Sequence, residues 1–121
     1  MTDEELARET RKQRRLELLG TNEPRCGTCG HIRWQAIERH HPADHGRDDA
    51  TVLICRNCHR VLSDDQKDHP AFDPAADKTL DTIGHFLLGL ADMLRIIIDK
   101  LYEFGRALIE RAATADDPGA K

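Results

Sequence analysis

All four cysteines of this chain fall into two Cys-x-x-Cys pairs, Cys26/Cys29 and Cys55/Cys58. Two intervening residues let both thiolates of a pair reach one metal ion, and two such pairs complete a tetrahedral Zn²⁺ site. We therefore predict a structural zinc ion held by four sulfurs. Disulfides and free thiols are the alternative, but paired cysteines in a reducing compartment bind metal more often than they form disulfides.

The composition predicts one small domain with appended segments. The chain has 121 residues, of which 33% are charged and 4% are aromatic, so a metal ion or oligomerisation is needed to stabilise so small a core. The N-terminal stretch is highly charged and lacks the apolar segment of a secretory signal, which predicts a cytoplasmic location. The net charge is −4 and no segment is strongly basic, which weighs against a protein that binds nucleic acid by charge alone.

Residues 1–25 are expected to form a helix and a short connection. Thr2 and Glu5 have the spacing of a capping box and Gly20 is a typical helix end, so the helix is placed at residues 2–19. Three leucines are expected to dock this helix on the core: Leu6, Leu16 and Leu19. Its basic residues are interpreted as a solvated face, with a phosphate-contacting arm as the alternative.

Residues 26–66 are expected to form an α+β zinc domain. The elements in order are a strand at 32–39 that ends at His40-His41-Pro42, a polar loop at 43–50, a strand at 51–54 and a helix at 57–66. Asn57 is the expected cap of the helix, with Val61 and Leu62 facing inward. Four other histidines are expected at the surface or at caps: His31, His45, His69 and His85.

Residues 67–79 contain two prolines and are expected to form a linker, followed by a long amphipathic helix at 80–113 and a disordered tail at 114–121. Apolar residues recur in the helix with heptad spacing: Leu80, Ile83, Leu87, Leu90, Leu94, Ile97, Leu101, Phe104 and Leu108. Such a repeat predicts a helix that packs on other helices. We expect self-association into a dimer or tetramer. Docking on the same chain is the first alternative, and a membrane surface or a foreign protein is the second. Charged residues interrupt the apolar run, which argues against a membrane-spanning segment.

The order of these motifs resembles the HNH endonuclease family: Cys-x-x-Cys, a strand ending in His-His-Pro, and a second strand leading into Cys-x-x-Cys-His. The resemblance covers residues 26–66 and includes the stretch ERHHPADHGRDDATVLICRNCHRVL. It implies a ββα-metal fold with a four-cysteine zinc knuckle, in an enzyme that hydrolyses phosphodiester bonds in DNA. The helices at both ends of the chain lie outside it.

The resemblance also implies roles for three histidines. His41 would be the general base, while His40 and His59 would bind a catalytic divalent ion, Mg²⁺ or Mn²⁺, distinct from the structural Zn²⁺. These roles suit phosphodiester hydrolysis, which needs a base for water and a cation near the phosphoryl oxygens. Adjacent residues of a regular strand point to opposite faces, so which of His40 and His41 faces the ion stays open. Four arginines are candidates for phosphate contact: Arg39, Arg47, Arg56 and Arg60.

One position departs from the family pattern. The family's middle asparagine, which braces the loop, stands five residues before the second cysteine pair, and Ala50 occupies this position here. Asp48 and Asp49 are the candidates to replace it. The leading hypothesis is a metal-dependent HNH-type endonuclease that nicks or cleaves DNA, assembled through its C-terminal helix. The alternative is a non-catalytic zinc-binding adaptor that oligomerises and binds a protein or nucleic-acid partner.

Overall fold

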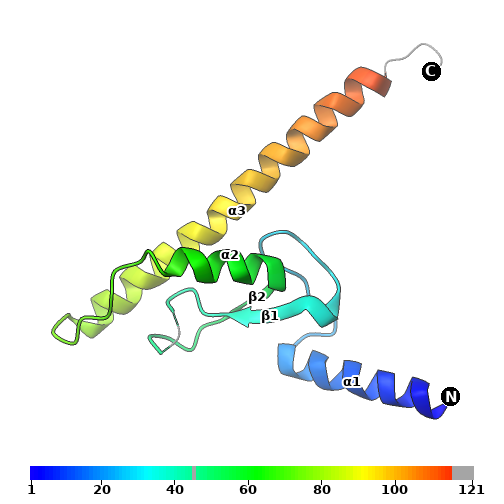
Figure 1. Cartoon of the computed structure of the whole chain (residues 1–121), viewed down its shortest axis with the longest axis horizontal. Helices are drawn as coiled ribbons and strands as arrows, with labels where there is room; N and C mark the ends of the chain where they lie inside the picture. Colours follow the sequence, from blue (N-terminus) through cyan, green and yellow to red (C-terminus); the bar gives the residue numbers. More distant parts are fainter. Residues whose placement is uncertain (45, 116–121) are drawn as a thin grey trace.

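The computed structural model of the chain describes residues 1–44 and 46–115. It has an α+β fold with three α-helices and one two-stranded antiparallel sheet (Figure 1). The elements in chain order are α1 (Asp3–Leu19), the 3-10 turn η1 (Trp34–Ala36), β1 (Ile37–His40), β2 (Val52–Cys55), α2 (Arg56–Gln66) and α3 (Lys78–Ala115). The β1–β2 hairpin and α2 lie between α1 and α3, and the C-terminal half of α3 projects away from the rest of the molecule (Figure 1).

The ends of α1 confirm the predicted caps. The Thr2 hydroxyl accepts a hydrogen bond from the Glu5 backbone amide, and the Glu5 carboxylate accepts one from the Thr2 amide. This reciprocal pair satisfies two of the amides that a helix start leaves without an internal partner. Gly20 ends the helix in the left-handed region, with φ of 76°, a conformation that glycine adopts without steric cost.

α1 docks on the hairpin through its C-terminal end. Leu16 and Leu19 are buried there, as predicted. The Arg39 guanidinium, from β1, donates hydrogen bonds to the Leu18 carbonyl and so fixes the end of the helix. Leu6 is 57% exposed, so the expectation that it docks on the core is wrong. It lies on the N-terminal half of α1, which extends beyond the hairpin (Figure 1).

The hairpin is shorter than predicted. β1 and β2 pair over four residues each, with Ile37 opposite Cys55 and His40 opposite Val52. β1 starts later than expected because η1 occupies the preceding residues, and Ile32 is 67% exposed and outside the strand. β2 is shifted by one residue so that it includes Cys55. The strand therefore leads directly into the second cysteine pair.

The two faces of the hairpin have different neighbours. Side chains alternate along a strand, and residues opposite each other share a face. Glu38, His40 and Ile54 therefore lie on one face, which is covered by α2, while Ile37 and Cys55 lie on the other. The buried side chains of the core cluster are Leu19, Cys26, Ile37, Ile54, Cys55, Cys58, Leu62 and Met93.

α2 begins one residue earlier than predicted because its cap differs. Cys55, not Asn57, is the N-cap, and its sulfur accepts a hydrogen bond from the Cys58 amide. Leu62 is 1% exposed and packs in the core as expected. Val61 is 50% exposed, so its predicted inward orientation is wrong. Adjacent side chains of a helix point about 100° apart, so with Leu62 in the core its neighbour Val61 points toward solvent.

The segment between α2 and α3 has no helix or strand up to Asp77, but it is fixed on α3. His69 contacts Asp92 at 2.7 Å, and a His85 ring nitrogen lies 3.0 Å from the Pro70 carbonyl oxygen. α3 begins at Lys78 and includes residues 114 and 115 of the predicted tail. Residues 116–121 of that tail lie outside the described residues. Within the described residues, none of the helices combines the length and the apolar character needed to span a membrane.

α3 has two faces, which we name by their residues. The docked face packs on the rest of the chain and consists of His85, Gly89, Asp92, Met93 and Ile96. The heptad face consists of the nine heptad residues from Leu80 to Leu108. At 100° per residue these two faces point about 130° apart. Docking on the same chain therefore occurs, but through a different face from the one that the heptad pattern marks.

Candidate metal centre and histidine site

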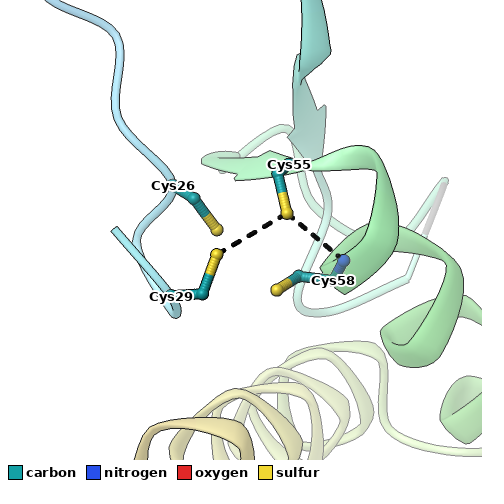
Figure 2. Close-up of side chains that lie close together, drawn as sticks. All are labelled: Cys26, Cys29, Cys55 and Cys58. Carbon is teal, nitrogen blue, oxygen red and sulfur yellow. Dashed lines mark hydrogen bonds between the residues drawn. The ribbon is translucent and has the colours of Figure 1, made fainter. Parts of the chain in front are cut away.

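The four cysteines form a cluster that is positioned to bind a metal ion such as zinc. Their sulfurs all lie within 4.8 Å of one another, and Figure 2 shows them pointing toward a common centre from the 26–29 loop and from the β2–α2 junction. The Cys29 and Cys55 sulfurs are 3.7 Å apart. A tetrahedral site with Zn–S bonds of about 2.3 Å requires sulfur separations of about 3.8 Å. The observed spacing fits this requirement.

Backbone hydrogen bonds shape the first cysteine pair. The Gly30 amide donates to the Cys26 carbonyl, and Gly30 has φ of 79°, a left-handed conformation that closes the tight turn. The Gly27 amide donates to the Leu53 carbonyl and so joins this turn to β2. A residue that the sequence analysis missed is Thr28, whose buried hydroxyl lies 3.2 Å from the Cys26 sulfur.

The thiols of the cluster are in different electrostatic environments. Burial raises the pKa of Cys29 and of Cys58. Burial also acts to raise the pKa of Cys26, but hydrogen bonds from Thr28 and from backbone amides lower it to about 6. A bound cation favours the thiolate form of each of these groups. The donor set and its geometry thus fit a soft divalent ion.

The structure brings two of the predicted site histidines together. His40 ends β1, His59 lies in the first turn of α2, and their ring centroids are 5.4 Å apart with the rings nearly perpendicular. His40 is only 2% exposed, and its buried Nε2 has no hydrogen-bond partner among the described residues. An unpaired buried nitrogen is costly in a folded protein. His40 Nε2 is therefore available as a ligand atom.

His41 and Glu38 flank this pair. The His41 backbone carbonyl accepts hydrogen bonds from the Gln66 side chain and from the Asp44 amide, which fixes the chain just after β1. The His41 side chain is half-buried, in contrast to that of His40. Glu38, which the sequence analysis did not single out, lies 3.8 Å from His59 Nδ1. It follows from β-strand alternation that Glu38 shares its face with His40.

Burial of His40 predicts a pH-dependent stability. Burial, followed by the charges of His59 and His41, lowers the pKa of His40 from 6.5 to about 4. Between pH 6.5 and pH 4 the His40 side chain is protonated in the unfolded chain but neutral in the folded chain. The free energy of unfolding therefore falls as the pH falls toward 4. Between pH 7 and pH 5 this loss amounts to about 2 kcal/mol. Urea unfolding at the two pH values, without added divalent ion, measures it.

The matched comparison is with His40→Gln, which removes the titrating group. Carboxylates and thiolates contribute the same pH dependence to both proteins, so they cancel in the difference. The variant is expected to lose less stability on acidification than the wild type. Equal losses in both proteins would show that His40 is not held neutral by burial.

An open groove of about 880 Å³ runs along the exposed side of α2 next to the histidine pair. Its lining includes Glu38, His59 and three basic side chains, those of Arg56, Arg60 and Lys67. Lys67 is within 3.5 Å of Asp64, whereas Arg56 and Arg60 are exposed and form no ion pair with any residue that the structure describes. The groove thus places two free guanidinium groups beside His59.

The other two candidate arginines have intramolecular partners. Arg39 donates hydrogen bonds to the Leu18 carbonyl and to the Thr51 hydroxyl. Arg47 is mostly buried and pairs with Asp81 at 2.9 Å and with Asp44 at 3.4 Å. The four candidate arginines therefore do not form one surface.

Ala50, which stands where the HNH family has its middle asparagine, is held by a neighbouring aspartate. The Ala50 amide donates a hydrogen bond to the Asp48 carboxylate at 3.3 Å. Asp48 therefore braces the chain two residues before β2, in the part of the loop where the sequence analysis sought a replacement. Asp49 is exposed.

Of the histidines that were expected at the surface or at caps, His85 is buried and His69 is half-buried. His85 is 5% exposed and lies against two backbone carbonyls, and His69 pairs with the buried Asp92. His31 is exposed as expected, and His45 lies outside the described residues. His69 and His85 both take part in the contact between α3 and the preceding segment, His69 through Asp92 and His85 through the Pro70 carbonyl. No local pattern marks this contact, because it depends on how α3 docks.

Comparisons with protein-family models, with curated proteins and with solved structures found no match for this chain.

Proposed function

We propose that this chain is a metal-dependent endonuclease of the HNH type, which nicks or cleaves DNA by phosphodiester hydrolysis. The observation that carries the proposal is the approach of His40 and His59, with ring centroids 5.4 Å apart, beside a groove that displays Arg56 and Arg60. The β1–β2–α2 order and the adjacent cysteine cluster agree with the ββα-metal fold that the sequence motifs imply.

The two metal sites have separate roles in this proposal. The four cysteines use all their sulfurs on a Zn²⁺ ion that joins the 26–29 loop to α2 and leaves no position for substrate. His40 and His59 are the ligands proposed for Mg²⁺ or Mn²⁺, and His40 is held neutral as a ligand imidazole must be. Mg²⁺ usually keeps several waters, so two protein ligands are compatible with its binding. When bound, the ion supplies positive charge that offsets the charge on the phosphoryl oxygens.

His41 acts as the general base. It accepts a proton from the attacking water as the water oxygen bonds to phosphorus and the bond to the leaving ester oxygen breaks. The half-buried position of His41, with its backbone carbonyl bound by Gln66, supports a fixed orientation for this step. Arg56 and Arg60 hold the phosphate backbone in the groove without reading sequence.

The test is conversion of supercoiled plasmid by zinc-loaded protein with and without added Mg²⁺ or Mn²⁺. Nicked or linear product that appears only with the added ion supports the proposal, and the ratio of the two products reports whether sites act in pairs. Intact plasmid and intact single-stranded DNA under all conditions would contradict it. That result, together with tight DNA or protein binding that survives His40→Ala, would identify a zinc-binding adaptor. Ala50 in place of asparagine is the observation that favours this second function.

Replacing the two groove arginines is expected to weaken DNA binding. In Arg56→Gln/Arg60→Gln, the slope of log affinity against log salt concentration should become shallower by about 2, since each lost phosphate contact removes about 0.9. The charge-matched control is Arg8→Gln/Arg14→Gln on the exposed side of α1. Fluorescence anisotropy with duplex DNA at several salt concentrations measures both. An equal loss in the control would show that binding depends on overall charge and not on the groove, and a loss in the control alone would place the contact on the helical arm.

A further inference from the structure

The heptad face of α3 is exposed along the whole helix. Eight of its nine residues, all but Ile97, are between 37% and 70% exposed. The contacts of α3 with the other described residues use the docked face, on the other side of the helix, so these residues leave the heptad face uncovered. A continuous apolar surface of this length is rare on a monomer.

The last part of α3, residues 101–114, is not packed on any other element that the structure describes. Residues 101–114 are all exposed, and this part of the helix projects away from the other elements (Figure 1). Helices in proteins owe most of their stability to packing of an apolar face. The described residues of one copy supply no such packing for this part of α3, which favours a partner from outside them.

The glycines of α3 indicate where the partner approaches. Glycine destabilises a helix interior compared with alanine, so a glycine inside α3 indicates a position where a side chain would not fit. At Gly89 the chain itself excludes a side chain, because a Cβ atom there would collide with the Pro42 carbonyl. Gly84 and Gly105 face open space. They are three heptads apart and flank the heptad face on the same side, which suits close approach of a second backbone.

A hollow at Gly105 has the shape of a helix-packing site. An apolar groove of about 470 Å³ is lined by Ile98, Leu101, Tyr102, Gly105, Arg106 and Ile109. The first four residues have the spacing i, i+3, i+4 and i+7. Four residues in this arrangement form the hole that receives one side chain of a facing helix in knobs-into-holes packing.

We propose that the heptad face binds the heptad face of a second copy of this chain, with Gly84 and Gly105 at the points of close backbone approach. The distal half of α3 carries three acidic and three basic residues: Asp99, Lys100, Glu103, Arg106, Glu110 and Arg111. This balance lacks the basic excess of a helix that binds anionic membranes. It also gives no net charge that would select an oppositely charged partner. A neutral apolar stripe is self-complementary about a twofold axis.

This proposal does not depend on nuclease activity. The docked face of α3 packs on the domain that contains α2, which carries His59 and the groove arginines. A copy bound to the heptad face lies on the opposite side of α3. The groove remains accessible in the assembly. If the chain is a nuclease, pairing brings two sites into one particle, which is what cleavage of both DNA strands requires.

Sedimentation analysis of the zinc-loaded full chain tests the proposal. The wild type is expected to form a dimer or tetramer, and Leu101→Gln/Leu108→Gln should weaken association at least tenfold. The control is Glu103→Gln/Glu110→Gln, on the opposite side of the same exposed half, which should leave association unchanged. A wild type that stays monomeric at all concentrations would overturn the proposal, as would equal effects in the two double variants.

A second variant separates loss of the interface from loss of the fold. Gly105→Gln replaces glycine by a good helix former, so it should raise the helix content of an unpaired chain. If a second copy packs at Gly105, the same change should instead weaken association at least tenfold. Ala107→Gln, on the other side of the helix, is the matched control and should have no effect. Unchanged association in Gly105→Gln would show that no second copy packs at this position, and vesicle flotation of a monomeric wild type would identify a membrane surface as the occupant.

Discussion

Removal of zinc is expected to unfold the domain formed by residues 26–66. Three of the eight buried residues in the core cluster are cysteines, and the hairpin pairs over only four residues per strand. A structural Zn²⁺ site contributes about 10 kcal/mol or more, which is comparable to the whole stability of a small domain. Without the ion, the cysteine sulfurs form no metal–sulfur bonds and contribute little to the stability of the fold. We expect loss of cooperative thermal unfolding on chelation.

Cys58→Ser tests this prediction without a chelator. Cys58 is buried at the start of α2, while the neighbouring Asn57 is exposed, so Asn57→Ser is the matched control. The chain has one tryptophan, Trp34, which is half-buried in η1 and reports on the packing of the hairpin. We expect Cys58→Ser to lose zinc and to show the tryptophan emission of the unfolded chain at 25 °C. Retained zinc and a native spectrum in Cys58→Ser would contradict a four-sulfur site.

His41→Ala is expected to reduce the rate of DNA cleavage by a factor of about 10² to 10⁴, the usual contribution of a general base. Its side chain lies outside the core, so zinc content and thermal stability should stay close to those of the wild type. Single-turnover cleavage with saturating protein measures the chemical step apart from DNA binding.

The control for this variant is His31→Ala, which removes an exposed histidine from the loop of the first cysteine pair. It should cleave at the wild-type rate. If His41→Ala keeps full activity while His31→Ala does the same, His41 is not the base and another group must accept the proton.

Local sequence patterns predicted the elements that depend on local interactions. The capping box at Thr2 and Glu5 and the terminal Gly20 fixed the bounds of α1, because caps act within one turn. The two Cys-x-x-Cys pairs predicted a four-cysteine cluster, since two intervening residues let both sulfurs of a pair reach one metal ion. The heptad repeat located α3 to within two residues at either end.

Contacts between distant segments were not predictable in the same way. β1 starts at Ile37, opposite Cys55, and the 3-10 turn η1 occupies the residues before it. Arg39 binds the end of α1 and Arg47 binds Asp81, although both arginines were expected to contact phosphate. These partners lie far away in the sequence and are brought close only by the docking of α1 and α3. The contacts of His69 with Asp92 and of His85 with Pro70 have the same origin.

His40 and His59 are proposed to form a second metal site, separate from the cysteine cluster. Titration of Mn²⁺ into zinc-loaded protein, followed by electron paramagnetic resonance, tests it most directly. We expect the wild type to bind Mn²⁺ and His59→Ala to lose this binding while it keeps its zinc, with Arg60→Ala as the adjacent control. Equal Mn²⁺ binding by the wild type and His59→Ala would contradict the claim.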